Sequence, residues 1–182
     1  MIRVISGKYR SRILSQPNTT NTRPTMDRVR EAIFSSIRQD IENKIVLDLF
    51  SGSGAFSIEA ISNGAMKAVS IENNKEALKV INDNIKALKI NNLEVLNLDV
   101  LIFLKRYTGR VFDYIFLDPP YKEYETLNSS LELIVNNNFL NNFGKIILET
   151  DNPEEIKIPN ELVLNKIKKY GKVYVLFIHK NI

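Results

Sequence analysis

From Lys44 onward, short apolar runs alternate with segments whose apolar residues recur at helical spacing. The apolar runs predict buried strands at residues 44–50, 67–72, 93–99, 111–118 and 144–150. The segments between them predict helices at residues 55–64, 74–90, 100–107 and 125–140. Regular strand–helix alternation favours a doubly wound parallel sheet that has helices on both faces.

The two ends of the chain depart from this alternation. Residues 161–180 contain two apolar-rich runs on either side of Tyr170 and Gly171, which predicts an antiparallel hairpin. Residues 2–7 and 11–15 are short enough to pair as a hairpin, followed by a polar loop and a helix at residues 26–37. We therefore expect a small extension at residues 1–40 and an α/β domain at residues 41–182, with a mostly parallel seven-stranded sheet.

Composition excludes several classes of site. The 182 residues include no cysteine and one histidine, so disulfides, thiolate catalysis and a histidine- or cysteine-rich metal site are excluded, and no metal is expected. Apolar runs never approach the ~18 residues of a membrane span. The first residues lack the pattern of a signal peptide. We expect a soluble, cytoplasmic protein without a membrane partner.

The net charge of +4 is unevenly distributed. Residues 1–38 hold eight basic and two acidic side chains, whereas the rest of the chain holds 17 basic and 19 acidic ones. Arginine-rich positive charge suits phosphate backbones, because guanidinium groups match phosphate oxygens and displaced counterions favour binding. The alternative is a solvated surface without a partner.

Four predicted strands end in an acid, and ligands of such sheets bind beyond the carboxyl ends of the strands. These acids are Asp48, Glu72, Asp99 and Asp118. The first lies in DLFSGSG, where Gly52 and Gly54 permit a tight turn into the next helix. Ser57 stands where a dinucleotide fingerprint has its third glycine or alanine, so a pyrophosphate is disfavoured. A cationic or zwitterionic ligand suits Asp48 better.

Glu72 is placed to accept hydrogen bonds from two ribose hydroxyls, and Asp99 to accept one from an adenine amino group. Ribose, adenine and a cationic amino-acid moiety together describe S-adenosylmethionine. We expect its site to comprise the acids, the glycine loop and their chain neighbours: Asp48, Phe50, Ser51, Gly52, Gly54, Glu72, Asn73, Asp99 and Val100. Taken singly, each acid is equally explained as a helix N-cap or loop residue.

The stretch FDYIFLDPPY, residues 112–121, ends a predicted strand in an acid, two prolines and a tyrosine. Pro119 and Pro120 stiffen the backbone, so the Asp118 carboxylate and the Pro119 carbonyl become fixed acceptors. Two fixed acceptors can hold an exocyclic amino group and aim its nitrogen at a methyl donor. Tyr121 is then expected to stack on a base that has left its helix or loop. The alternative is a proline-rich strand terminator with a surface tyrosine.

Five segments together resemble the RsmD family of class I S-adenosylmethionine-dependent methyltransferases, which methylate N2 of one guanine in bacterial 16S rRNA. The segments are RVISGKYRSRIL, TRPTMDRVREAIF, VLDLFSGSGAFSIEAISNGA, FDYIFLDPPY and KYGKV. The resemblance implies a Rossmann-like class I fold, with a donor site at Asp48 to Gly54, Glu72 and Asp99. It also implies catalysis at Asp118, Pro119, Pro120 and Tyr121, and rRNA in an assembled or assembling small subunit as substrate.

The resemblance also implies that the basic extension contacts RNA. The contacts expected are Arg3, Lys8, Arg10, Arg12, Arg23, Arg28 and Arg30. One departure is ETDN after the fifth strand, where the family more often has a histidine following the acid, so the role of Glu149 stays open.

Three other functions fit parts of this pattern. An N6-adenine DNA methyltransferase uses the same amino-group chemistry, although no separate target-recognition domain is evident. An NAD-dependent oxidoreductase conflicts with the glycine spacing. A non-catalytic RNA-binding protein with a vestigial donor site can be distinguished from the enzyme only by measuring activity. Nothing in the sequence demands more than a monomer.

Overall fold

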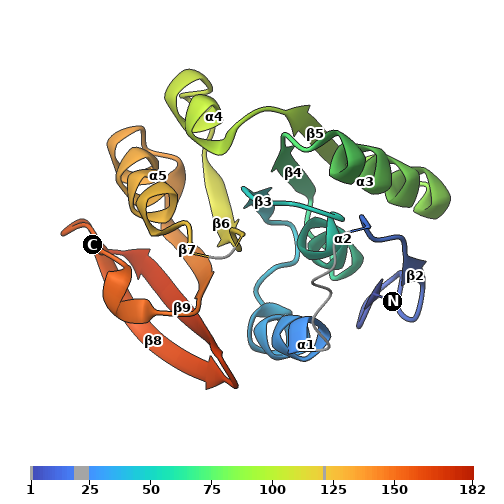
Figure 1. Ribbon diagram of the computed structural model, residues 1–182, viewed down its shortest axis with the longest axis horizontal. Coiled ribbons are helices and arrows are strands. Elements are labelled where there is room, and N and C mark those ends of the chain that lie inside the picture. Colours follow the sequence, from blue (N-terminus) through green and yellow to red (C-terminus); the bar gives the residue numbers. More distant parts are fainter. Residues whose placement is uncertain (1, 19–24, 121) are drawn as a thin grey trace.

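The computed structural model describes residues 2–18, 25–120 and 122–182. Its centre is a seven-stranded sheet with the order β5-β4-β3-β6-β7-β9-β8 (Figure 1). Neighbouring strands from β5 to β7 are parallel, and β9 runs antiparallel to both β7 and β8. The strands are β3 (Ile45–Asp48), β4 (Lys67–Glu72), β5 (Leu93–Asn97), β6 (Phe112–Leu117), β7 (Leu140–Thr150), β8 (Leu162–Tyr170) and β9 (Val173–Lys180).

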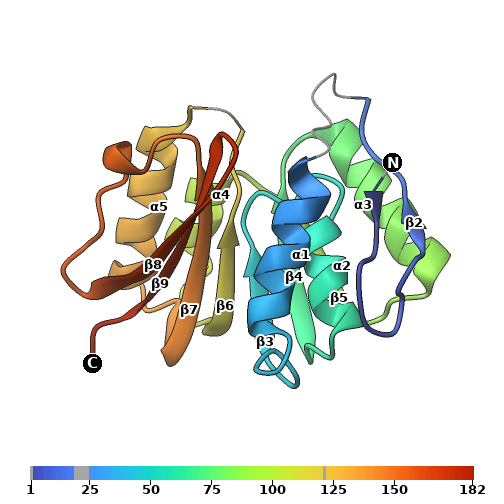
Figure 2. The same ribbon diagram turned by 90° about the horizontal axis from the view of Figure 1, so that it is seen from below.

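Helices cover both faces of this sheet (Figures 1 and 2). One face carries α1 (Thr25–Ile37), α2 (Ala55–Ser62) and α3 (Lys75–Leu88), and the other carries α4 (Val100–Arg106) and α5 (Tyr124–Asn136). Successive residues of the central strands alternate between two hydrophobic cores, one with α1 and α2 and one with α4 and α5. Burial on both faces explains why these strands are nearly continuous apolar runs.

The predicted strands, helices and C-terminal hairpin are all present, and the differences concern their ends. The helix expected to reach residue 140 stops at Asn136, and β7 already begins at Leu140. Asn138 has φ +54°, a left-handed conformation that no helix continues, and Leu140 then pairs with Phe112. The ladder slips between Phe112 and Tyr114, so the early part of β7 is joined to β6 through an irregularity.

The N-terminal hairpin forms as expected but is very short. Its strands are β1 (Ile2–Arg3) and β2 (Ile13–Leu14). Its turn rests on the end of α2, where the Lys8 amide donates to the Ser62 carbonyl at 2.8 Å. Gly7 has φ +79°, and a Cβ there would lie 1.9 Å from the Ser62 carbonyl oxygen. The glycine therefore fixes the docking of the hairpin onto the helix.

A 3₁₀ turn, η1 (Pro153–Glu155), follows β7. Among the helices of the described residues, none combines the length and apolar character needed to cross a bilayer.

Candidate active site

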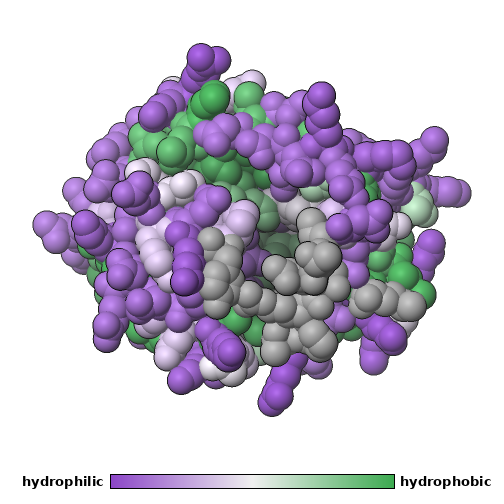
Figure 3. Space-filling model, in the orientation of Figure 1, coloured by the Kyte–Doolittle hydropathy of each residue, from purple (hydrophilic) through white to green (hydrophobic). Residues whose placement is uncertain are grey.

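The strand order places a topological switch point beside β3. The chain passes from β3 to β4 and β5 on one side and returns to β6 on the other. The loops that follow β3 and β6 are therefore adjacent at the carboxyl edge of the sheet, where ligands of open α/β sheets bind. A pocket of about 630 Å³ lies at this edge. Figure 3 shows a hollow in this face of the molecule, with apolar residues in its floor.

Most of the expected site residues line this one pocket. The residues contributed by the loop after β3, by the ends of β4 and β5 and by the loop after β6 are Phe50, Ser51, Gly52, Ser53, Glu72, Asn73, Asp99, Val100, Asp118, Pro119 and Pro120. Tyr121 lies outside the described residues, so its role stays a prediction. Asp48 and Gly54 are not among the residues that line the pocket.

The glycine loop is held by its two glycines in different ways. Gly52 has φ +53°, and a Cβ there would meet nothing within 4 Å, so its backbone conformation alone favours glycine. Gly54 has φ +79°, and a Cβ there would lie 2.5 Å from the side chain of Ile81 in α3. Gly54 therefore lets α3 pack closely under the loop, and Gly52 faces the pocket.

Glu72 ties the end of β4 to the same loop. Its Oε2 accepts a hydrogen bond from the Gly52 amide at 2.8 Å. Its Oε1 accepts from the amides of Asn73 and Asn74, each at 2.9 Å. A carboxylate has about four acceptor positions, so the fixed group retains capacity for ligand hydroxyls.

Asp48 corrects one expectation. Its side chain is fully buried, and the carboxyl accepts from the Ser57 hydroxyl at 3.1 Å through Oδ2 while Oδ1 has no hydrogen-bond partner. Burial raises the pKa of Asp48 to about 7, aided by the charges of Asp118 and Glu72 and opposed by hydrogen bonds from Ser51 and Ser57. Asp48 supports the loop from beneath rather than offering its carboxyl to the pocket.

Asp99 combines the two interpretations that the sequence left open. Its Oδ1 accepts from the amides of Leu101 and Ile102 at 2.9 and 3.1 Å, which makes it the N-cap of α4. It also lines the pocket, so the cap holds the carboxyl in place at the rim. Its contact with an adenine amino group stays a prediction.

One wall of the pocket was not predicted as part of the donor or catalytic site. That wall comes from the end of β7, the start of α5, α1 and β9, through Val29, Arg30, Tyr124, Thr126, Leu127, Glu149, Thr150, Asp151 and Val173. The Tyr124 hydroxyl donates to Asp151 at 2.5 Å, which joins α5 to the residue after β7. Glu149 near the end of a parallel strand was the available signal, because the rule that selected Asp48, Glu72, Asp99 and Asp118 applies to it equally.

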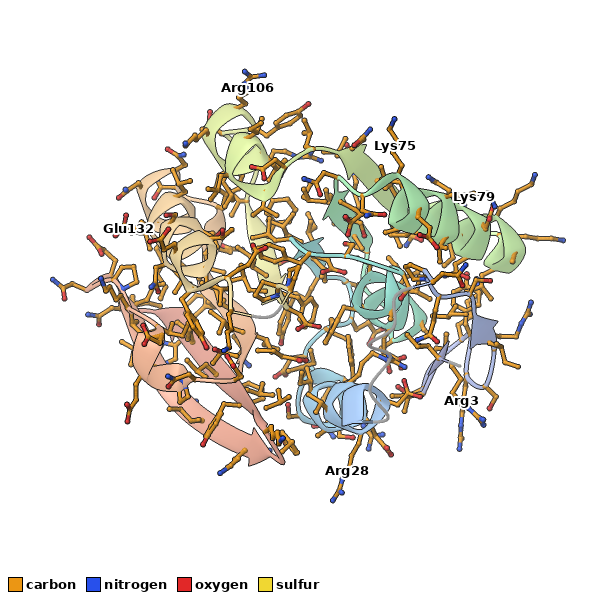
Figure 4. The ribbon with its side chains drawn as sticks, viewed as in Figure 1. Arg3, Arg28, Lys75, Lys79, Arg106 and Glu132 are labelled. Atoms are coloured by element: carbon orange, nitrogen blue, oxygen red, sulfur yellow. The ribbon has the colours of Figure 1, made fainter. Side chains whose placement is uncertain are left out.

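The expected RNA contacts do not all reach the surface. Arg3, Lys8, Arg10 and Arg12 on the hairpin and Arg28 on α1 are exposed. Figure 4 shows Arg3 and Arg28 pointing away from the protein on the same side. Arg23 lies outside the described residues.

The expectation for Arg30 as a surface contact is wrong, because its side chain is only 2% exposed. Its guanidinium donates to the Arg3 carbonyl at 2.6 Å and to Asp27 at 3.0 Å, and it lies 3.5 Å from Glu59. Glu59 is equally buried and accepts from the amides of Ile5 and Ser6. The buried Arg30–Glu59 pair therefore connects the hairpin, α1 and α2 in the protein interior.

Comparison with known proteins identifies the family. A family model described as Conserved hypothetical protein 95 matches residues 2–179. Ribosomal RNA small subunit methyltransferase D of Buchnera aphidicola (subsp. Baizongia pistaciae) is 37% identical over 184 residues, covering 99% of this chain and 93% of the relative. The chain belongs to the RsmD family.

A further RsmD relative and a solved structure agree with this assignment. Ribosomal RNA small subunit methyltransferase D of Escherichia coli (strain K12) is 32% identical over 173 residues, covering 94% of this chain and 86% of the relative. The structure of yhhF from Escherichia coli superposes with a TM-score of 0.89 at 31% identity, covering 98% of this chain and 97% of that one. The resemblance of the five sequence segments to the RsmD family and the expected class I methyltransferase fold are both confirmed.

Proposed function

We propose that this protein transfers a methyl group from S-adenosylmethionine to the exocyclic N2 amino group of a guanine in small-subunit 16S rRNA. The observation that carries the proposal is the meeting of Asp118, Pro119 and Pro120 with the glycine loop across one pocket at the switch point. Family membership supports the reaction and its substrate, because RsmD relatives bear the name ribosomal RNA small subunit methyltransferase D.

The residues of the pocket fit the methyl donor. Glu72 is held by three backbone amides and keeps acceptor capacity for the two ribose hydroxyls. Gly52 leaves its side of the loop open, since a Cβ there would meet nothing within 4 Å, so backbone can approach a ligand closely. Asp99 is placed by its cap to accept from the adenine amino group. S-adenosylmethionine supplies an electrophilic methyl group on a sulfonium centre.

The chain's own contribution to the reaction is to position the amine. The Asp118 carboxylate and the Pro119 carbonyl accept the two N–H bonds of the amino group, which directs the nitrogen lone pair across the pocket. Pro119 and Pro120 restrict the backbone, so little freedom is lost when the substrate binds. Asp118 accepts the proton that the methylated nitrogen releases. Tyr121 stacks on the extruded base.

Exposed cations of the hairpin and α1 hold the RNA backbone in this proposal. They are Arg3, Lys8, Arg10, Arg12 and Arg28. The substrate is rRNA in the small subunit or in an assembly intermediate, and a monomer has every residue that the reaction uses.

The test is methyl transfer from a labelled donor to three acceptors: small subunits lacking the modification, naked 16S rRNA and duplex DNA. We expect incorporation at one guanine N2 in the RNA, mapped by nuclease digestion and mass spectrometry. Incorporation only into adenine N6 of DNA would instead establish the alternative enzyme. Asp118→Ala is expected to lower turnover by at least ~100-fold while the affinity for the donor, measured by calorimetry, changes little. Unchanged turnover in this variant would refute the positioning role.

A further inference from the structure

The C-terminal hairpin of β8 and β9 carries a second concentration of positive charge, which the N-terminal extension does not account for. Four lysines fall between residues 166 and 172: Lys166, Lys168, Lys169 and Lys172. They lie on or directly after β8, the strand at one edge of the sheet. Within the described part of the chain, no carboxylate lies at ion-pair distance from their ammonium groups.

The strand directions bring this charge to the edge of the sheet that holds the pocket. Because β9 is antiparallel to both β7 and β8, β8 runs in the same direction as the parallel strands. Its last residue, Tyr170, therefore lies at the carboxyl edge, and Val173 at the start of β9 lines the pocket. Figure 2 shows the turn of the hairpin and the start of α1 at the same edge of the sheet.

Pairing across the hairpin shows which face the lysines occupy. Lys166 lies opposite Phe177 and Lys168 opposite Val175, and opposed residues share a face of the sheet. Phe177 and Val175 pack in the core that also contains α1, so Lys166 and Lys168 lie on the α1 side. Lys169 lies opposite Tyr174, which packs in the core on the other face.

The two lysines on the α1 side are held close together. The Nζ atoms of Lys166 and Lys168 lie 5.6 and 5.9 Å from the centre of the Phe177 ring. Contact with the Lys168 ammonium holds the pKa of Lys166 below its ordinary value. Like charges that repel one another on a surface are stabilised by a polyanion, which supplies counter-charge and releases condensed ions.

Lysines on an edge strand also discourage pairing with another sheet. That role explains charge anywhere along β8, but not its concentration in the half nearest the pocket. Glu161 precedes β8 at the opposite end, and the first residues of the strand, Leu162–Leu164, carry no charge. Along β8, the lysines therefore lie in the half of the strand nearest the active-site edge.

We propose that Lys166, Lys168 and Lys172 form a phosphate-binding surface for the RNA strand that flanks the target nucleotide. The strand lies across the carboxyl edge on the α1 side, with the hairpin lysines on one flank and Arg28 of α1 on the other. The inference rests on the proposed function, because it assigns a contact surface for that same substrate.

The test compares two variants that lose the same charge. K166A/K168A/K172A removes the proposed surface, and K79A/K105A/R106A removes three exposed cations elsewhere; Figure 4 shows Arg106 and Arg28 on opposite sides of the molecule. Binding to a 16S rRNA fragment is measured by fluorescence anisotropy at several salt concentrations, beside KM and kcat for methyl transfer. A third variant, K166R/K168R/K172R, keeps the charge.

We expect the hairpin variant to bind RNA at least about tenfold more weakly and to lose about 2 from the slope of log affinity against log salt, since each phosphate contact contributes ~0.7 to 0.9. KM for RNA rises with little change in kcat, and donor affinity is unchanged. The control and the lysine-to-arginine variant behave as the parent protein.

Two results would overturn the inference while leaving the proposed function intact. In the first, the parent protein methylates RNA and the hairpin variant keeps its KM and salt slope, whether or not it aggregates more readily. In the second, the hairpin and control variants weaken binding equally, which shows a general charge effect. A parent protein that methylates no RNA refutes the proposed function instead, and anisotropy with the same fragment still reports whether the hairpin binds RNA.

Discussion

At the scale of single residues, Asp48 shows that the site contains a carboxyl whose burial is energetically unfavourable. The Asp48 carboxyl at the end of a central strand is removed from water, and the hydrogen bond from the Ser57 hydroxyl offsets only part of the lost hydration. Its oxygen Oδ1 has no partner, which is rare for a buried polar atom. Such a group affects stability in a way that depends on pH.

Burial raises the pKa of Asp48 from 3.8 to about 7. The folded state therefore binds a proton that the unfolded state has released, and stability falls as the pH rises from about 4 through 7. We expect Asp48→Asn to remove this contribution, so that the loss of unfolding free energy between pH 5 and pH 8 shrinks by roughly 2–3 kcal/mol. Urea unfolding of both proteins at the two pH values measures it. An equal pH dependence in the variant would show that Asp48 is ionised throughout.

Gly54 allows a prediction that separates backbone strain from crowding. Gly54 and Gly109 both have positive φ, +79° and +86°, but a Cβ on Gly109 would meet nothing within 4 Å. Gly109→Ala should cost only the strain of a left-handed alanine, roughly 1 kcal/mol, whereas Gly54→Ala should cost about 1–3 kcal/mol more because it strikes Ile81. Thermal unfolding of the two variants measures these two losses of stability. Gly54→Ala should cost less stability in an Ile81→Ala background than in the parent protein, and equal costs of the alanines at positions 54 and 109 would contradict the contact with Ile81.

Residue types at strand ends were predictable from sequence, because the position of an acid after a buried strand follows from the pattern alone. The direction in which each carboxyl points was not. Asp48 and Asp118 end neighbouring strands, yet one lies beneath the loop and the other lines the pocket. The difference depends on Ser57 and Ser70, which come from other elements and form the polar environment under the loop.

At the scale of elements, α1 presents two arginines with opposite roles two residues apart. Arg28 points outward and Arg30 inward, because a step of two residues on a helix turns the side chain by more than half a circle. A count of charges along the sequence gives Arg28 and Arg30 the same expected role. Only the packing of α1 against α2 and the hairpin distinguishes them, because Arg30 forms an ion pair with the buried Glu59 on α2.

We expect Arg30→Ala to lower the unfolding free energy by about 3 kcal/mol or more, because it leaves the buried Glu59 without its ion pair. Arg28→Ala should leave stability within about 0.5 kcal/mol and instead weaken RNA binding and its salt dependence. Denaturant unfolding and anisotropy with rRNA measure the two properties. Weaker RNA binding by Arg30→Ala under conditions where it is fully folded would restore a direct contact for Arg30.

Element boundaries were less predictable than element types, because contacts between residues distant in the sequence decide where an element ends. The pattern of residues 125–140 is compatible with one long helix, but the left-handed Asn138 ends it and sends Leu140 into the sheet. Asparagine adopts this conformation more readily than most residues, so Asn136–Asn138 was a weak stop signal. The pairing of Leu140 with Phe112, nearly thirty residues away, decides the boundary.

At the scale of the whole molecule, the extension and the α/β part share one core. Residues of β1, β2 and α1 pack in the same cluster as the α1-facing residues of β3, β6 and β7. Phe34 of α1 lies 6.2 Å from Phe56 of α2 and 5.7 Å from Phe116 of β6, measured between ring centres. The division at residue 40 therefore does not separate folding units, and the RNA contact expected of the extension stays a prediction.

We expect residues 41–182 alone to lack a stable fold. Removing α1 exposes Phe116 and Phe56, which pack against Phe34. Removing α1 and the hairpin together leaves the buried Glu59 without its partners Arg30, Ile5 and Ser6. Each large apolar side chain returned to water costs about 1.5–3 kcal/mol, and an unpaired buried charge about 3–5 kcal/mol, so the sum approaches the 5–15 kcal/mol stability of a typical domain. Circular dichroism melting, dye binding to exposed apolar surface and donor titration compare the fragment with the full chain. A fragment that melts cooperatively near the parent's temperature and binds donor would show that the α/β part is independent, and the N-terminal residues would then be an appendage rather than one wall of the core.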